Sequence, residues 1–276
     1  QRVFGVGSVE TAQTLQGLGR TLYFSGRYEE AERLMLQALR IRRLELGPAH
    51  WKVGDADNDL GALYYQIGRY DDAAAYWQES LTISERWAGR DHPEVGTVAN
   101  NIGRSLLIAG KPADAKPYLE KALDLWRRTR PADHDLAIPL NSLAMIDIAR
   151  HDYGSAETKL DEALKICEVR SFWLTDQVLT NLADVYARTG RASQAEELLT
   201  RARALLAKQY PHDTMPDEAW RYALQDAVLA TSYAAEKKYP QARKLLTDAL
   251  PVVRKRFGAG RYYTRDLEER LARLPR

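Results

Sequence analysis

The chain repeats one 22-residue pattern at an interval of 42 residues. LGRTLYFSGRYEEAERLMLQAL occupies residues 18–39, and LGALYYQIGRYDDAAAYWQESL occupies residues 60–81. Gly19 in the first copy corresponds to Gly61 in the second, and Gly103 continues the series. Repetition at a fixed period of this length is the signature of an array in which each unit packs only on its neighbours. The chain is therefore expected to fold as a solenoid rather than around one central core.

Each copy predicts two helices joined by a tight turn. Apolar residues recur at helical spacing on both sides of the turn, which contains Gly26 in the first copy and Gly68 in the second. Glycine adopts the left-handed conformation of a helix C-terminus at little cost. Asp91 fits the N-cap of the third pair, because Pro93 is tolerated in a first turn. The sequence thus predicts an all-α fold of about six helix pairs.

The predicted organisation has three parts, namely a leader over residues 1–8, a repeat array over residues 9–258 and a C-terminal capping helix over residues 259–276. The six predicted repeats span residues 9–47, 51–89, 91–130, 133–170, 173–210 and 216–258. The last helix is amphipathic, with Leu267 and Leu271 on one stripe, as expected of a terminal cap.

The N-terminal end has no comparable cap. The chain begins at Gln1 and enters a repeat almost at once. Terminal repeats normally carry a polar outer face, so this pattern suggests a fragment of a longer protein. The uncapped end also offers a possible homodimer contact.

The overall charge argues against one class of partner. The chain carries 40 basic and 38 acidic side chains, a formal net charge of +2, and the two signs are interspersed. Phosphate-backbone binding needs a concentrated basic surface, so nucleic acid is not expected as a partner. No apolar run approaches the roughly 18 residues that span a bilayer, so direct membrane insertion is not expected either.

No group of residues points to catalysis, a metal or a cofactor. Cys167 is the only cysteine, which leaves no partner for an internal disulfide. His50, His92 and His134 recur every 42 residues and fall on successive linkers about 10 Å apart, too far to share an ion. We expect them to pack the linkers, and the six tryptophans to pack helices or linkers. Asp147 stands at a core position, where a slight rotation of the helix, or a bond to an arginine or a backbone donor, is expected rather than a functional acid.

The recurring residues resemble the tetratricopeptide repeat. Gly61 is followed three residues later by Tyr64, Gly68 forms the turn, and Ala73 stands in the second helix. The 42-residue period resembles the kinesin-light-chain-like subclass, as found in C-terminal regions of bacterial Ser/Thr protein kinases and regulators. The resemblance implies a right-handed superhelix whose first helices line a concave groove. Three positions depart from the repeat pattern: Pro112, Asp147 and Lys237.

Helical geometry predicts which residues face the groove. We take the small residue of each first helix as the reference. The positions three before it and one, four and five after it form a second face, because a helix turns by about 100° per residue. The predicted peptide-binding residues at these positions are Arg20, Tyr23, Asn58, Tyr65, Asn100, Arg104, Asn141, Asp184 and Arg188.

Three of these residues form a ladder of asparagines, Asn58, Asn100 and Asn141, at one position of consecutive repeats. A carboxamide donates and accepts hydrogen bonds, as the backbone of an extended peptide does. Arg20 and Arg104 could hold a carboxylate with two parallel hydrogen bonds. The alternative is that the asparagines join neighbouring helices and keep the repeats in register, and the two interpretations are compatible.

Geometry and resemblance together predict a non-catalytic module that binds an extended peptide or a partner's segment in the groove. The resemblance further implies the sensory part of a larger bacterial signalling protein such as a Ser/Thr kinase. That setting places the segment in the cytoplasm or, after a transmembrane helix, in the periplasm. Two alternatives stay open: a self-association element and, less favoured, a domain that senses a small molecule.

Overall fold

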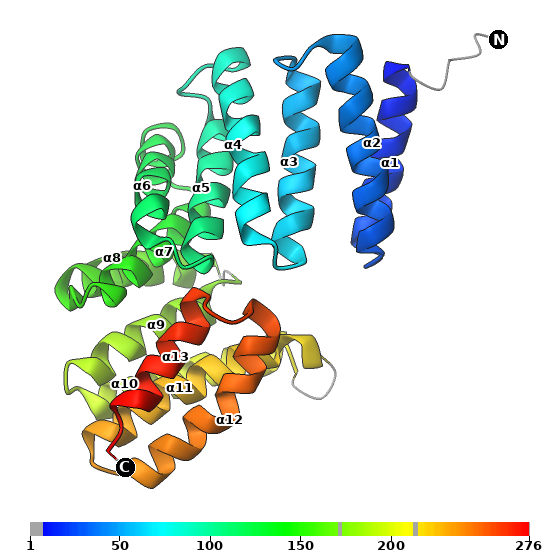
Figure 1. The fold of residues 1–276 in the computed structure, drawn as a ribbon. Coiled ribbons are helices and arrows are strands. Elements are labelled where there is room, and N and C mark those ends of the chain that lie inside the picture. The colour runs from blue at the N-terminus through cyan, green and yellow to red at the C-terminus, as the bar shows by residue number, and fades with distance from the viewer. Residues whose placement is uncertain (1–7, 171–172, 212–214, 276) are drawn as a thin grey trace. The chain divides into compact units, whose positions relative to one another are not determined.

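The computed structural model describes residues 8–170, 173–211 and 215–275, which form helices joined by short turns (Figure 1). The α-helices are α1 (Val9–Phe24), α2 (Tyr28–Leu46), α3 (Trp51–Gln66), α4 (Tyr70–Trp87), α5 (Pro93–Ile108), α6 (Pro112–Thr129), α7 (Ala137–Ala149), α8 (Tyr153–Arg170), α9 (Thr175–Arg188), α10 (Ala192–Gln209), α11 (Ala219–Ala235), α12 (Tyr239–Phe257) and α13 (Tyr262–Arg273). Two short 3-10 helices, η1 (His134–Leu136) and η2 (Pro216–Glu218), precede α7 and α11. None of the described helices is long and apolar enough to cross a membrane.

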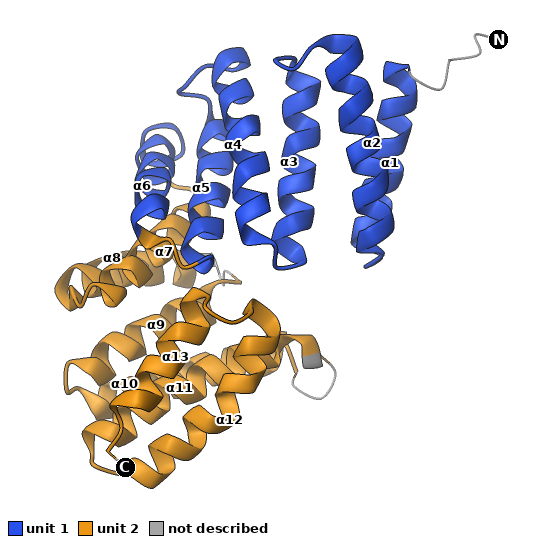
Figure 2. Cartoon of the chain, viewed as in Figure 1, with its two compact units in different colours: residues 1–109, 113–130 blue, residues 110–112, 131–276 orange. Residues whose placement is uncertain are grey.

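The helices form two compact units (Figure 2). Unit 1 comprises residues 1–109 and 113–130, and unit 2 comprises residues 110–112 and 131–276. Unit 1 contains three helix pairs, α1 to α6, apart from the first residue of α6. Unit 2 contains three further pairs, α7 to α12, followed by α13. The predicted all-α repeat fold is confirmed. Of the predicted leader, only Ser8 lies among the described residues, and its hydroxyl caps α1.

Small residues let the two helices of a pair approach closely. A Cβ atom added at Gly61 of α3 would lie 2.6 Å from the indole ring of Trp77 on α4. A Cβ atom at Gly103 of α5 would lie 2.5 Å from Leu119 on α6. These glycines recur because nothing larger fits against the partner helix. The recurring pattern therefore marks the seam inside each pair.

Residues with positive φ form the turns within the pairs. Gly26 and Gly68 have φ angles of 77° and 80°. Where glycine is replaced, His151 and Lys237 adopt the same conformation, with φ angles of 61° and 63°. An ordinary residue pays about 1–2 kcal/mol for a left-handed conformation. The departure from the repeat pattern at Lys237 therefore keeps the turn and raises its cost.

Histidines cap the helices that follow the first two linkers. His50 Nδ1 accepts a hydrogen bond from the backbone N–H of Lys52 at 3.1 Å, and His92 Nδ1 accepts one from Glu94 at 3.3 Å. The His50 ring also lies 5.5 Å from that of Trp87. Each imidazole satisfies one of the free N–H groups of a helix N-terminus. These histidines therefore order the linkers, as the sequence predicts.

The N-cap prediction for Asp91 is wrong. Helix α5 begins at Pro93, so the residue directly before it, His92, takes the cap position. Asp91 lies outside the helix, and its carboxylate instead accepts a hydrogen bond from Arg128 of α6 at 3.0 Å. The proline defines the first helical position and therefore moves the cap by one residue.

Asp147 is a buried acid with a charged partner. The side chain is on α7, only 8% of the residue is exposed, and its carboxylate accepts a hydrogen bond from Lys159 Nζ of α8 at 2.6 Å. A paired carboxylate can stand at a core position because the partner offsets the cost of desolvation. The partner is a lysine rather than the predicted arginine or backbone donor.

We predict that Gly61→Ala lowers the free energy of unfolding by about 1–3 kcal/mol, because the added methyl group overpacks the seam against Trp77. Urea denaturation followed by far-UV circular dichroism measures the change. Gly17→Ala is the matched control, since Gly17 also lies within a helix and has no atom within 4 Å of the added Cβ. That control is expected to raise stability by up to about 1 kcal/mol through helix propensity. Equal effects of the two substitutions would contradict the close-packing explanation.

Candidate functional site

The predicted groove residues are divided between the two units, and each unit's set is described by itself. We call residues Gln16, Arg20, Tyr23, Asn58, Tyr65, Asn100 and Arg104 of α1, α3 and α5 the unit 1 inner face. We call residues Asn141, Met145, Thr180, Asp184, Arg188, Ala227 and Thr231 of α7, α9 and α11 the unit 2 inner face. Several of these side chains bond from one first helix to the next, so these positions do lie between consecutive first helices.

The first predicted arginine is already bound by two carboxylates. Arg20 Nε donates to Asp59 Oδ2 at 2.6 Å, and its terminal nitrogen donates to Asp55 Oδ1 at 2.9 Å. The amide of Gln16 donates to the same two acids. Hydrogen bonding to Asp59 raises the pKa of Arg20 above its ordinary value. Arg20 therefore joins α1 to α3, and a ligand carboxylate would have to compete with these partners.

An open cavity lies beside this network, at the N-terminal half of α3. Its volume is about 560 Å³, and its lining residues are Gln13, Gln16, Gly17, Arg20, Arg42, Trp51, Lys52 and Asp55. Trp51 stacks on the His50 ring of the linker at a centroid distance of 5.8 Å, as the sequence pattern predicts, and remains 50% exposed. The cavity continues the unit 1 inner face and adds an aromatic surface to it.

The second predicted arginine is held by an aromatic ring. The Arg104 guanidinium lies 5.5 Å from the centre of the Tyr65 ring, and it donates a hydrogen bond to the Tyr65 hydroxyl at 3.3 Å. Tyr65 is fixed in turn by an edge contact with Tyr70 and a tilted contact with Trp77, at centroid distances of 5.4 Å and 5.9 Å. Among the described residues, no carboxylate lies within ion-pairing distance of Arg104. This cation is positioned but keeps its capacity to bind an anion.

Tyr23 belongs to a second aromatic group on the unit 1 inner face. Its ring lies 5.1 Å from that of Phe24 and 6.1 Å from that of Tyr28. Phe24 is 83% exposed, so this group presents apolar area to solvent. Gln66 of α3 reaches the Tyr28 hydroxyl at 3.5 Å, which connects the aromatic group to the next repeat.

The three ladder asparagines have three different environments. Asn58 Oδ1 accepts a hydrogen bond from the indole N–H of Trp77 at 3.0 Å, within one helix pair. Asn141 Oδ1 accepts one from Asn181 Nδ2 at 2.8 Å, which joins α7 to α9. The buried carbonyl of Asn100 has no hydrogen-bond partner in the part of the chain that the structure describes. The register role predicted as the alternative thus fits Asn141, whereas Asn100 keeps unused hydrogen-bonding capacity.

In unit 2, the predicted residues Asp184 and Arg188 bind the last helix. Arg270 of α13 donates to both carboxylate oxygens of Asp184, at 2.8 Å and 2.9 Å. Arg188 donates to Asp184 at 2.9 Å and to Asp266 of α13 at 2.9 Å. The adjacent arginines keep the pKa of Asp266 below its ordinary value despite burial. The four side chains form a closed network of alternating charge.

Sequence reasoning missed this contact because it treated α13 only as a cap on the last pair. A signal was present in the spacing of the charges. Asp184 and Arg188 stand four residues apart on α9, and Asp266 and Arg270 stand four residues apart on α13. Two helices with matched pairs of this kind can place each acid beside the other's base.

A cavity of about 40 Å³ remains between α9, α11 and α13. At one end, Arg221 pairs with the buried carboxylate of Asp176 at 3.3 Å and lies over the ring of Trp220. Burial raises the pKa of Asp176, although the arginine opposes the shift. Ile148 and Leu267 are among the cavity's apolar lining residues. The space is large enough for ordered water but smaller than a typical ligand pocket.

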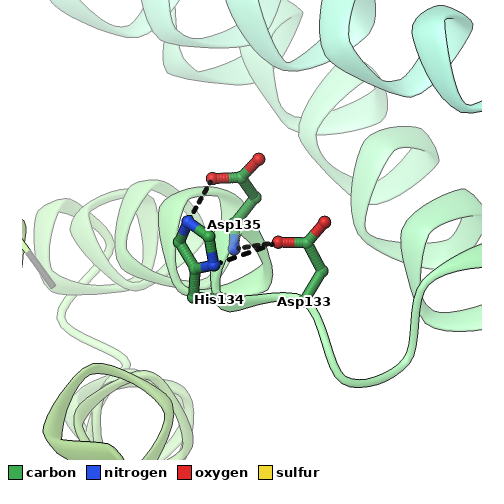
Figure 3. Close-up of side chains that lie close together, drawn as sticks. All are labelled: Asp133, His134 and Asp135. Carbon is green, nitrogen blue, oxygen red and sulfur yellow. Dashed lines mark hydrogen bonds and ion pairs between the residues drawn. The ribbon is translucent and has the colours of Figure 1, made fainter. Parts of the chain in front are cut away.

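Two groups that resemble reactive sites have structural explanations. Asp133, His134 and Asp135 lie together (Figure 3), with one potential ligand atom of each within 4.8 Å of the others. Asp133 Oδ1 accepts the Asp135 N–H at 3.0 Å and thereby caps η1, which accounts for the grouping. Separately, burial raises the pKa of the Cys167 thiol to about 11, so it stays protonated at neutral pH.

Family models described as Tetratricopeptide repeat match most of the chain, over residues 11–52, 53–128 and 135–208. Among curated proteins, none matches the chain's sequence significantly.

Solved structures show the same fold. BtubC (BKLC) from P. vanneervenii is 24% identical, with a TM-score of 0.61 over 73% of this chain and 88% of that one. A putative kinesin light chain from Podosopora anserina with nearly identical TPR-like repeats is 20% identical, with a TM-score of 0.60 over 73% of this chain and 98% of that one. A Rap protein complexed with Competence and Sporulation Factor is 16% identical, with a TM-score of 0.61 over 94% of this chain and 75% of that one. At these identities, the likeness concerns the fold alone.

We predict that Asn141→Ala lowers the free energy of unfolding by about 1–3 kcal/mol, because it removes the bond to Asn181 and leaves a space in a buried contact. Urea denaturation measures the loss. Asn101→Ala is the matched control, since Asn101 is a partly buried first-helix asparagine with no side-chain hydrogen bond to a described residue. A change below about 0.5 kcal/mol for both variants would argue against a register role for Asn141.

Proposed function

Because the chain belongs to the tetratricopeptide-repeat family, we propose that it binds an extended peptide segment of a partner protein on the unit 1 inner face. The fold is that of a protein–protein interaction module. The observation that carries the choice of surface is Arg104, a cation that Tyr65 holds in place and that pairs with no acid of the described residues. We propose that it anchors a carboxylate of the peptide, from an acidic side chain or the C-terminus.

The neighbouring side chains suit the rest of a peptide. Asn58 uses its carbonyl to hold Trp77, so its amide remains a donor for a backbone carbonyl. The buried Asn100 carbonyl has no hydrogen-bond partner among the described residues, and it can accept a backbone N–H of the ligand when the side chain turns toward the surface. A buried polar atom without a partner costs free energy, which a ligand bond would recover.

Aromatic side chains supply the apolar part of the surface. Tyr23 and Phe24 lie at the C-terminal end of α1, and Tyr65 lies at the corresponding part of α3. Rigid aromatic rings give large contact area at low conformational-entropy cost. The proposed ligand therefore combines an acidic group near α5 with apolar side chains near α1. Arg20 contributes less to binding, because Asp55 and Asp59 already neutralise it.

We propose a regulatory role for this binding, as the sensory part of a larger bacterial signalling protein such as a Ser/Thr kinase. The resemblance of the long-period repeats to arrays in such proteins supports this setting. One structural relative was solved in complex with Competence and Sporulation Factor, which supports ligand binding by the fold. We assign no catalytic role to the described residues.

Selection from a phage-displayed library of random peptides tests the proposal. We expect the full chain to enrich peptides with an acidic residue or a required free C-terminus. Fluorescence anisotropy with one selected peptide should then show that Arg104→Gln weakens binding about tenfold or more, since a hydrogen bond to a charged group is worth roughly 1.5–3 kcal/mol.

Arg40→Gln is the matched control. Arg40 is an exposed arginine of α2, the second helix of its pair, and no carboxylate of a described residue pairs with it. The control should leave the dissociation constant unchanged. Equal losses from the two variants would contradict a specific anchor at Arg104. If no peptide is enriched and light scattering shows a dimer, the self-association alternative would replace this proposal.

A further inference from the structure

Helix α13 lies on the unit 2 inner face and binds three consecutive first helices. The Tyr262 hydroxyl donates to the backbone carbonyl of Met145 on α7 at 2.9 Å. Arg270 reaches Asp184 on α9 and Thr231 Oγ1 on α11, the latter at 2.8 Å. Met145, Asp184 and Thr231 occupy the same position of successive repeats, directly after the small residue. The helix therefore engages the positions where repeat geometry predicts a ligand.

Charge spacing makes this surface selective for a helix. Asp184 and Arg188 on α9 face Arg270 and Asp266 on α13, and each acid contacts the opposite helix's arginine within 2.9 Å. One helical turn separates the two charges on each helix, so the four groups align only when both segments are helical. An extended peptide would place charges at a different spacing, because a strand rises more than twice as far per residue.

Toward α9, the seat of α13 consists mainly of charged groups, two arginines and two acids. Within this 12-residue helix, the buried side chains are Thr264 and Leu267. Ion pairs transferred from water contribute little net stability, so most of the contacts between α13 and α9 bring specificity rather than strength. Leu267 also leaves the cavity beside Ile148 and Trp220 incompletely filled. A segment with a larger apolar side chain at this place would pack better than α13 does.

The connection to α12 permits movement of α13. Gly258 ends α12 with a φ angle of 92°, and Gly260 has a φ angle of 72°. Glycine has access to many backbone conformations, so two glycines within three residues allow the connection to change its backbone conformation at low cost. The contacts of α13 with α9 are polar, the cavity beside it is unfilled, and its connection to α12 contains two glycines. For these three reasons we infer that α13 can leave its site.

We propose that the unit 2 inner face is a receptor for an amphipathic helix of a partner protein, and that α13 occupies this receptor in the free chain. The partner helix presents the chemistry of α13, namely two adjacent aromatic residues, then an acid and an apolar residue, then an arginine. In α13 these groups are Tyr262, Tyr263, Asp266, Leu267 and Arg270. The partner binds by displacing α13. This site belongs to unit 2, whereas the peptide site proposed above belongs to unit 1, and it recognises a helix rather than an extended segment.

A synthetic peptide of residues 259–276 with a fluorescent label is the probe, and the full chain is the receptor. Arg270→Glu in the chain places a negative charge beside Asp184 and Asp266, which should release α13 and leave the receptor face intact. We expect this variant to bind the peptide at least tenfold more tightly than the unmodified chain does. Arg273→Glu is the matched control, because Arg273 lies on the same helix with its side chain 61% exposed, and Glu269 is its one ion-pair partner among the described residues. It should bind as weakly as the unmodified chain.

Two changes in the peptide test the recognised chemistry. A peptide with Arg270→Glu should lose binding, because it repels Asp184. A peptide with Leu267→Phe should bind severalfold more tightly, because the larger ring fills the cavity. Circular dichroism checks that the Arg270→Glu chain is folded. If it is not, Tyr262→Phe, which removes only the hydroxyl bonded to Met145, should give a smaller gain in peptide binding.

Two results would overturn the proposal. Peptide binding that does not rise in folded Arg270→Glu or Tyr262→Phe chains would show that α13 is a permanent part of unit 2. Light scattering that shows the unmodified chain to be a dimer, with dimerisation lost in Arg270→Glu but kept in Arg273→Glu, would identify the occupant as α13 of a second copy instead of a partner helix.

Discussion

The close approach of the two helices in each pair is the constraint on which the other features depend. Gly61 and Gly103 leave room for Trp77 and Leu119, and any larger residue would collide with them. Helices packed this closely have a defined rotation about their own axes. The residues at the seam therefore also decide which side chains face away from it. The candidate binding surfaces follow from backbone packing, and their specificity comes from residues that the packing leaves free to vary.

Whether an arginine of the inner faces can bind a ligand depends more on its neighbouring side chains than on its position in the repeat. Arg20 and Arg188 both stand at predicted groove positions, and each is bound by two acids. Arg104 stands at the same repeat position as Arg20, but it contacts an aromatic ring and hydroxyl. A ligand carboxylate gains more from a cation that has no carboxylate partner to exchange. The two inner faces are therefore chemically different surfaces, although one repeat pattern produces both.

Several polar groups of the unit 2 inner face form hydrogen bonds with the chain's own last helix, α13. Asp184 accepts from Arg188 and Arg270, and the Met145 carbonyl accepts from Tyr262. A surface whose recognition positions are occupied by the chain's own helix can bind a partner only when that helix leaves. Such exchange has a low cost where the internal segment is held by polar contacts and a flexible connection, because water replaces those contacts when the segment leaves.

The sequence by itself determined the features that depend on near neighbours. The all-α repeats, the turns at Gly26 and Gly68 and the small residues at the seam are local or recur at one period, so a single sequence displays them. The tertiary structure decided how the side chains pair. Asp184 and Arg270 are 86 residues apart in the chain, and the fates of Asn100 and Asn141 differ although their repeat positions agree. Hydrogen bonds form over about 3 Å, so small differences in packing decide which groups are satisfied and which remain for a ligand.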